Sequence, residues 1–121
     1  MKLIIAGTRT INKYRAFYEF QKWRANGHRF GIHTFLSGEA TGPDQVPYLV
    51  KEIWGDISPL VEPYPADWDT HGKAAGPIRN RVMAKEGDAL LLIWDGKSRG
   101  SNDMRKAMKE LWKPVYEVLV N

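Results

Sequence analysis

The sequence contains no cysteine and no long hydrophobic run, and each absence excludes a class of protein. Without cysteine the chain has no disulfide scaffold, no thiolate nucleophile and no sulfur-ligated metal, which favours a cytoplasmic setting. No apolar run approaches the roughly 20 residues that span a membrane. The apolar stretch LIIAG near the start is too short for a signal peptide, so we expect no membrane partner.

The chain also lacks any run of five or six basic residues. Its 18 Lys and Arg exceed its 14 Asp and Glu, which gives a net charge of +4, and the charges are interspersed. A positive net charge favours an anionic partner, whereas the absence of a basic run argues against a nucleic-acid-binding tail. The histidines His28, His33 and His71 do not have the spacing of a metal site, so we expect neither a metal nor a cofactor.

What the chain does contain is enough for one globular domain. Its length of 121 residues is close to the usual size of a single domain, and 43% of the residues are hydrophobic. We therefore expect residues 1–121 to form one domain around one core.

Short apolar runs that are typical of strands alternate with segments of helical spacing. The strand candidates are 3–7, 32–38, 59–65, 89–96 and 114–120. Helical spacing links four sets of residues: Tyr14, Phe17, Tyr18 and Gln21; Val46, Leu49, Val50 and Ile53; Ile78 and Val82; Met104, Ala107, Met108 and Leu111. This alternation predicts an α/β fold, a Rossmann-like three-layer sandwich with a five-stranded parallel sheet (order 3-2-1-4-5) and helices on both faces.

The candidate site residues are those that follow the strands, because such sheets bind ligands beyond the carboxyl ends of their strands. These segments are rich in Gly, Ser, Thr, Asp and Arg, whose amides, hydroxyls and cations bind phosphate and ribose. The predicted ligand-binding residues are Gly7, Thr8, Arg9, Ser37, Gly38, Glu39, Ala40, Thr41, Gly42, Asp44, Asp67, Trp68, Lys73, Gly76, Pro77, Arg79, Asn80, Asp95, Gly96, Ser98, Gly100 and Ser101.

The segment HGKAAGPIRNR (71–81) places cations at a predicted helix start. Pro77 suits the first helical position and Gly76 allows close approach of a ligand, so Arg79 would lie in the first turn. A cation there is unfavourable with the helix macrodipole by roughly 0.3 to 1 kcal/mol unless an anion completes the site. We therefore expect Arg79 to bind a phosphate, so that its removal barely changes stability, and Arg81 to be a surface cation.

The segment YRAFYEFQKW contains more aromatic side chains than one core-facing stripe of a helix can bury. The aromatic residues are Tyr14, Phe17, Tyr18, Phe20 and Trp23. We therefore expect a homodimer or higher homo-oligomer that covers part of this helix.

Four stretches of the chain resemble the YspA-type, YpsA-related family of the SLOG superfamily. They are GTRT, SGEATGPD, PADWDTHGKAAGPIRNRVMA and DALLLIWDGKSRGS, and the resemblance runs over essentially the full chain. It implies a Rossmann-like fold that binds nucleotides or nucleotide-derived ligands through these loops. The superfamily includes LOG-type phosphoribohydrolases, sensor domains for NAD-derived signals and the DNA-processing protein DprA. The chain lacks the PGGxGTxxE motif of LOG-type hydrolysis, and Glu39 stands where the second glycine of SGGA is usual.

Three functions follow from these observations, in this order. The first is a sensor or sequestering protein that binds a nucleotide-derived, phosphoribose-containing ligand at the C-terminal edge of the sheet. The second is a phosphoribohydrolase-like N-glycosidic hydrolase, in which Glu39, Asp44 or Asp95 would stabilise an oxocarbenium ion or activate water. The third is binding of single-stranded nucleic acid, which the net charge favours but the scattered cations do not.

Overall fold

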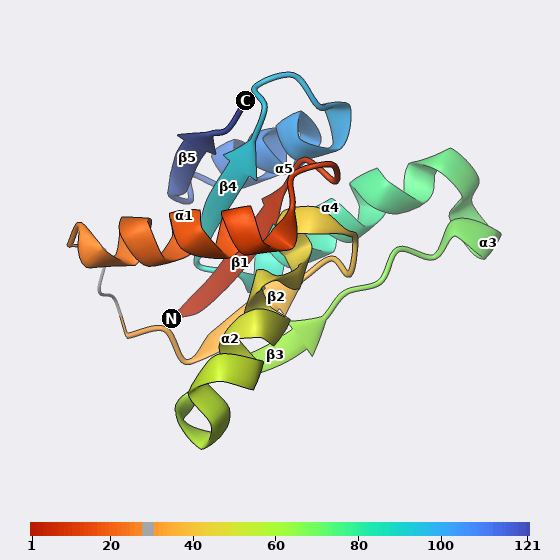
Figure 1. Ribbon diagram of the computed structural model, residues 1–121. Helices are drawn as coiled ribbons and strands as arrows, with labels where there is room; N and C mark the ends of the chain where they lie inside the picture. The colour runs from red at the N-terminus through yellow and green to blue at the C-terminus, as the bar shows by residue number, and fades with distance from the viewer. Residues whose placement is uncertain (28–30) are drawn as a thin grey trace.

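The computed structural model describes residues 1–27 and 31–121, which contain a five-stranded parallel sheet with helices on both faces (Figure 1). The order β3-β2-β1-β4-β5 confirms the predicted α/β sandwich and strand order, and all four strand pairs are parallel. The strands are β1 (Lys2–Gly7), β2 (Thr34–Ser37), β3 (Leu60–Pro63), β4 (Ala89–Trp94) and β5 (Val115–Leu119).

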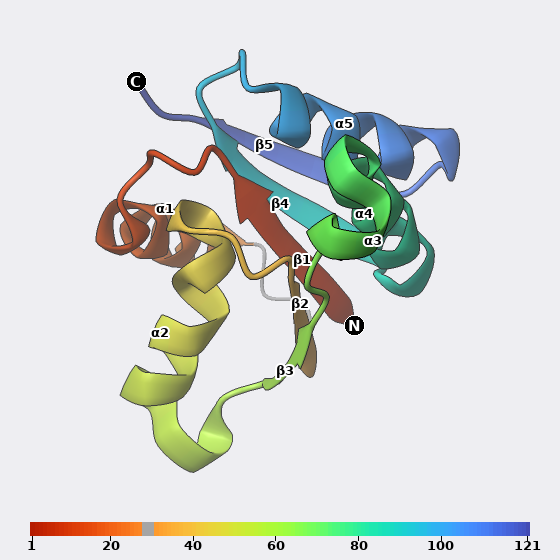
Figure 2. The ribbon, with the colours of Figure 1, turned by 90° about the vertical axis from the view of Figure 1, so that its right-hand side faces the viewer.

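Two helices cover each face of the sheet (Figure 2). One layer holds α1 (Lys13–Ala25) and α2 (Val46–Trp54), and the other holds α4 (Ala75–Glu86) and α5 (Arg99–Glu110). The short elements are α3 (Trp68–His71) and the 3-10 turns η1 (Gly42–Gln45), η2 (Gly55–Ile57) and η3 (Gly72–Ala74).

The core lies on both sides of the central strands. In β1, Leu3 and Ile5 pack toward α1 and α2, whereas Ile4 packs toward α4 and α5, because successive side chains of a strand point to opposite faces. All six residues of β4 are buried, as expected for a central strand with helices on both sides. The carboxyl ends of β1 and β4 therefore lie side by side at the middle of one sheet edge.

The buried face of α1 differs from the predicted one. Ala16, Glu19, Phe20 and Trp23 are buried, whereas Tyr14 and Tyr18 are 63% and 58% exposed. Aromatic residues occur at helical spacing on more than one side of this helix, so periodicity alone does not select a face. Packing selects the side with Ala16, where the small side chain lets the helix approach the sheet.

The buried face of α4 also differs from the prediction. Ile78 and Val82 are 42% and 46% exposed, whereas Asn80, Met83 and Ala84 are buried. Two apolar residues four positions apart are too few to show which face of a helix is buried, because another face of the same helix can hold as many apolar residues. The helix packs on α5 through its smaller and more flexible residues.

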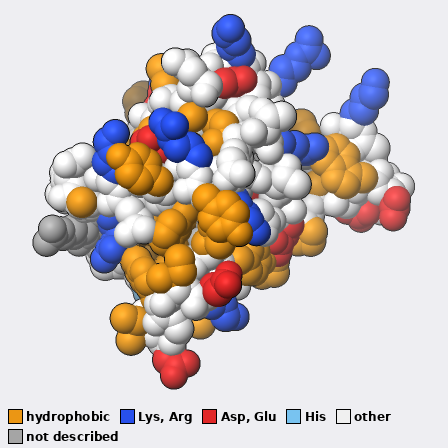
Figure 3. Space-filling view, viewed as in Figure 1, with side chains coloured by type: hydrophobic (Ala, Val, Ile, Leu, Met, Phe, Trp, Pro, Cys, Tyr) orange, Lys and Arg blue, Asp and Glu red, His pale blue; other side chains and the backbone are white. Residues whose placement is uncertain are grey.

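The outer face of α1 has lysines next to its exposed tyrosines. Lys13 Nζ lies 5.4 Å from the centre of the Tyr14 ring, and Lys22 Nζ lies 5.8 Å from the centre of the Tyr18 ring. Figure 3 shows hydrophobic side chains over α1 and α2 with Lys and Arg among them. The association of copies through this helix stays a prediction.

No helix in the described part of the chain has both the length and the apolar composition of a membrane span. His28 lies outside the described residues. Across residues 1–27 and 31–121, no three His, Asp or Glu side chains are grouped so that they could hold a metal ion.

Candidate functional site

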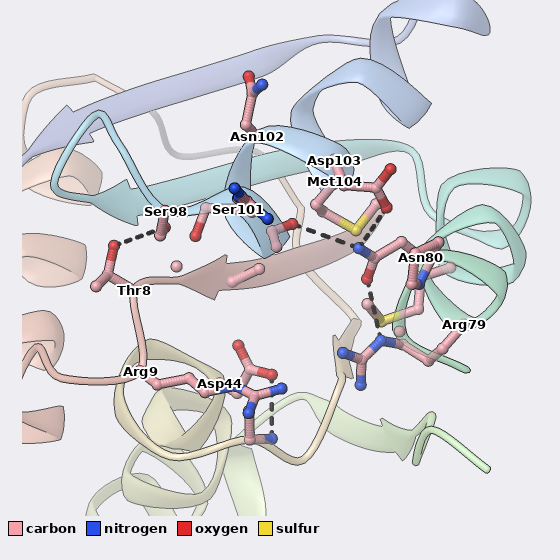
Figure 4. Close-up of a pocket in the computed structure, with 18 of the residues that line it drawn as sticks. Thr8, Arg9, Asp44, Arg79, Asn80, Ser98, Ser101, Asn102, Asp103 and Met104 are labelled. Atoms are coloured by element: carbon pink, nitrogen blue, oxygen red, sulfur yellow. Dashed lines mark hydrogen bonds between the residues drawn. The ribbon is translucent and has the colours of Figure 1, made fainter. Parts of the chain in front are cut away.

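A cavity of about 700 Å³ opens at the sheet edge where the strand order reverses between β1 and β4. The loop after β1, the first two turns of α5 and one side of α4 surround it (Figure 4). Its lining includes these predicted site residues: Gly7, Thr8, Arg9, Ala40, Asp44, Trp68, Lys73, Gly76, Pro77, Arg79, Asn80, Ser98, Gly100 and Ser101.

A second cavity of about 340 Å³ adjoins the first and is named here the small cavity. Arg9, Ala40, Trp68 and Arg79 line both cavities. The remaining lining of the small cavity consists of Gly38, Glu39, Thr41, Pro65 and Ala66. The loop after β2 is thus brought to the same site as the loop after β1.

Sequence reasoning and structure differ at the margins of this site. The predicted residues that line neither cavity are Ser37, Gly42, Asp67, Asp95 and Gly96. The lining residues that were not predicted are Ala6, Thr10, Pro65, Ala66, Met83, Arg99, Asn102, Asp103, Met104 and Lys106. The unpredicted lining residues on α5 lie in its first two turns, directly after Ser98. A predicted site that continued from the loop into this helix would have included them. Met83 and Met104 look like ordinary core residues in the sequence.

The N-terminus of α5 faces the cavity without a capping side chain. Ser98 is the N-cap residue, but its hydroxyl makes no hydrogen bond to the helix amides and lies 3.0 Å from Thr8 Oγ1. The first turn of α5 contains no acidic residue. Unpaired amides and the positive end of the helix dipole are therefore available to an anion.

Asp95 has a structural role in this loop. Its Oδ1 accepts hydrogen bonds from Lys97 N (2.8 Å), Ser98 N (2.9 Å) and Thr8 Oγ1 (3.2 Å). The two backbone hydrogen bonds hold the pKa of this exposed carboxyl below its usual value. Since Asp95 orders the turn and lies outside both cavity linings, its geometry does not support a catalytic role.

Ser101 is a buried hydroxyl in the lining of the large cavity. The residue is 5% exposed, and its Oγ has no hydrogen-bond partner among the described residues. Figure 4 shows Ser101 beside Ser98 on the first turn of α5, across from Thr8. A buried hydroxyl without a hydrogen-bond partner lowers the free energy of unfolding by about 1 to 3 kcal/mol. A polar ligand atom that forms a hydrogen bond with Ser101 Oγ would remove this destabilisation.

The helix start near Pro77 lies two residues earlier than predicted. The turn η3 leads directly into α4, which begins at Ala75, so Pro77 is its third residue and Arg79 its fifth. Pro77 still removes one of the N–H groups that have no partner in the first turn. Arg79 belongs to the second turn and does not face the macrodipole as a first-turn cation would.

Arg79 joins α4 to the loops after β2 and β3. Its Nη1 donates hydrogen bonds to the carbonyls of Gly38 and Tyr64, and its Nε donates to Asn80 Oδ1 at 3.0 Å. Burial lowers the pKa of the guanidinium, and the charge of Asp44 opposes this. The expectation that removing Arg79 leaves stability nearly unchanged does not fit these contacts.

Asp44 is a buried carboxyl in the lining of the large cavity. It is 5% exposed, and its Oδ2 accepts a hydrogen bond from Ala40 N at 3.2 Å. Burial raises the pKa of Asp44 to about 6, although this hydrogen bond and the charges of Arg79 and Arg9 lower it. The carboxyl is therefore neutral at mildly acidic pH and ionised at neutral pH.

The contribution of Asp44 to stability is expected to fall as the pH rises from about 4 to about 6. The folded protein binds the proton more tightly (pKa about 6) than the unfolded chain (3.8), so the contribution is complete below the lower value and lost above the upper one. The contribution to the free energy of unfolding that is lost over this pH range is about 3 kcal/mol. Urea denaturation of the wild type and Asp44→Asn at pH 4 and pH 7 measures it. A stability difference between the two proteins that is the same at both pH values would contradict the assignment.

Glu39 has a backbone conformation that favours glycine. Its φ is 67°, in the left-handed region, which costs a residue with a side chain roughly 1 to 2 kcal/mol. The N–H of Glu39 donates to Ser37 Oγ at 3.1 Å, and Oε1 accepts a hydrogen bond from Tyr48 Oη. Burial and this hydrogen bond raise the pKa of Tyr48 to about 12. These contacts hold the Glu39 carboxylate beside the small cavity.

Arg9 and Trp68, which both line the two cavities, lie close together. Arg9 Cζ lies 5.9 Å from the centre of the Trp68 ring, and the backbone carbonyl of Arg9 accepts a hydrogen bond from Thr41 Oγ1 at 3.1 Å. Trp68 is 49% exposed. Its ring is thus accessible for stacking and does not act as a lid on the core.

Comparison with models of protein families finds no family that matches this chain, and no curated protein matches it. Among solved structures, a similar one is the crystal structure of the C-terminal domain of a hydrogenase from Pyrococcus furiosus. The two sequences are 15% identical, and the similarity covers 97% of this chain and 90% of that one with a TM-score of 0.46. So weak a likeness says nothing about the site of this chain.

Proposed function

We propose that the protein binds a nucleotide or a nucleotide-derived, phosphoribose-containing small molecule in the large cavity, as a sensor or a sequestering protein. The observation that supports this most directly is the unpartnered, buried Ser101 hydroxyl on the first turn of α5. Hydroxyls and helix amides converging at a helix N-terminus form a phosphate site. The place of the cavity, at the reversal of strand order, is where open parallel sheets bind such ligands.

The charges around the cavity also favour an anion. Its lining contains two carboxyl side chains, Asp44 and Asp103, and more cations than carboxyls. The cations are Arg9, Lys73, Arg79, Arg99 and Lys106. Because Asp103 accepts hydrogen bonds from Asn80 and Arg81, part of its charge is already compensated. An anionic ligand would balance the remaining positive charge.

Ser101→Ala is expected to change stability and binding in opposite directions. The free protein should gain about 1 kcal/mol, because a buried hydroxyl without a partner is removed. Affinity for the ligand should fall roughly tenfold, because one hydrogen bond to a charged group is lost. A nucleotide library screened by thermal shift identifies the ligand, and isothermal titration calorimetry of both proteins gives the affinity.

Ser58→Ala is the matched control, since Ser58 lies after η2 and lines neither cavity. It should leave affinity unchanged. Affinity should fall only shallowly with salt, as expected for one or two phosphates and not for a nucleic-acid strand. A screen in which no nucleotide raises the melting temperature, or equal affinity of the wild type and Ser101→Ala, would count against the proposal.

A second candidate is cleavage of an N-glycosidic bond, and the observation that favours it is Asp44. A carboxyl in the cavity lining with a pKa raised to about 6 is suited to deliver a proton to the base as its bond to the sugar carbon breaks. Water attacks that carbon and releases one proton to the solvent. Glu39 lines only the small cavity, and its carboxylate accepts a hydrogen bond from Tyr48. Chromatography of the recovered ligand separates the two functions, because a binding protein returns it intact.

Membership of the YspA-type family of the SLOG superfamily is part of the same proposal. The stretches that carry this resemblance supply the loops around both cavities, from Thr8 and Arg9 to Gly38, Arg79 and Ser98. A cytoplasmic setting and a homo-oligomer complete the proposal.

A further inference from the structure

The two cavities meet at two guanidinium groups. Arg9 and Arg79 line both, together with Ala40 and Trp68. A ligand that extends from the large cavity into the small one therefore passes beside two cations. A phosphate or diphosphate is suited to this passage, because guanidinium groups bind phosphate oxygens.

Away from this junction the lining of the small cavity differs in charge. Of the described residues that line the small cavity and not the large one, Glu39 is the only charged one, and the others are Gly38, Thr41, Pro65 and Ala66. The end of the small cavity is thus acidic where the junction is basic. An acidic end favours hydrogen-bond donors and opposes a second phosphate.

The Glu39 carboxylate is held in place and keeps one acceptor oxygen. Tyr48 Oη donates to Oε1, while no hydrogen bond within the described residues reaches Oε2. Residue 39 is a glutamate with a left-handed backbone (φ 67°), although glycine would adopt this conformation without strain. Strain that persists beside a cavity points to a use for the side chain there.

We infer that the small cavity binds a neutral, hydroxyl-bearing group, such as a sugar, at the far end of a ligand whose diphosphate lies at Arg9 and Arg79. Glu39 is the residue that determines this specificity, because Oε2 accepts hydrogen bonds from hydroxyls and its charge repels a terminal phosphate. An acidic residue after the second strand recognises ribose hydroxyls in a comparable way in dinucleotide-binding sheets. This inference rests on the proposed function of the large cavity.

The test compares three probes that share adenosine diphosphate: ADP itself, ADP-glucose with a terminal sugar, and ATP with a terminal phosphate. Calorimetry in EDTA keeps the full charge of each phosphate. The wild type should bind ADP-glucose about ten times more tightly than ADP, and ATP about ten times more weakly than ADP. In Glu39→Gln the disadvantage of ATP relative to ADP should disappear, and the advantage of ADP-glucose should shrink to about threefold or less.

Glu52→Gln is the control, because it removes the same charge from an exposed position on α2. It should keep the probe ranking of the wild type. Glu39→Gly, which accommodates the left-handed backbone, is the second variant in case the first does not fold, and it should also remove the disadvantage of ATP.

The test separates failure of the proposed function from failure of the inference about Glu39. If none of the three probes and no nucleotide of the library binds to the wild type, the proposed function is contradicted and the inference with it. If ADP binds but the ranking of ATP and ADP-glucose is the same in the wild type and in both Glu39 variants, only the role of Glu39 and the small cavity is overturned.

Discussion

Gly7→Ala is expected to lower the free energy of unfolding by about 4 kcal/mol or more, enough to leave little folded protein. A Cβ atom at Gly7 would lie 1.7 Å from the carbonyl oxygen of Ile93 and 2.8 Å from Pro43 Cγ. Gly7 and Ile93 are register partners at the carboxyl ends of β1 and β4, the two strands beside the large cavity. Neither backbone can move without breaking the central pairing of the sheet.

Gly100→Ala is the matched control for this change. Apart from the chain neighbours and the backbone of its own helix, no atom of the described residues lies within 4 Å of a Cβ at Gly100, in the first turn of α5. Alanine there should therefore stabilise the free protein by about 0.5 to 1 kcal/mol. Urea denaturation and the yield of soluble protein measure both variants. Wild-type stability of Gly7→Ala would show that the β1–β4 contact at the site is looser than described.

Arg79→Ala is expected to lower the free energy of unfolding by about 3 kcal/mol. The substitution leaves the carbonyls of Gly38 and Tyr64 without their shared donor and removes a cation that compensates Asp44. Because Asp44 is neutral near pH 4 and ionised near pH 7, the loss should be larger at pH 7. Urea denaturation at the two pH values measures both effects.

Arg81→Ala is the comparison for Arg79. The Arg81 side chain is 44% exposed and pairs with Asp103 at 2.9 Å and with Glu110 at 3.8 Å. Pairs this exposed contribute about 0 to 1 kcal/mol, so this variant should be only slightly destabilised. Equal stability of Arg79→Ala and the wild type would restore the simpler view of Arg79 as a ligand-binding residue without a structural role.

Much of the fold could be predicted because its signals are local. The apolar run of β4 indicates burial on both faces without reference to any other segment. Alternation of strands and helices restricts the connections to right-handed crossovers, and these bring the carboxyl ends of all strands to one edge. Thr8, Ser98 and Ser101 were therefore predicted to belong to one site, although 90 residues or more separate Thr8 from the two serines.

The sequence by itself determined the parallel sheet and the edge that holds the candidate site, because periodicity and chain connectivity suffice for these. The predicted strand order is confirmed, but alternation alone also permits the other common order of such sheets, 2-1-3-4-5, so only the structure decided between them. Only the tertiary structure decided which side of α1 is buried and which polar residues are bonded within the protein. Asp95 orders a turn, Arg79 reaches a carbonyl 41 residues away, and Ser101 has no partner among the described residues. Hydrogen bonds form at about 3 Å. Which groups come that close depends on packing between segments distant in the chain, and no local pattern contains that information.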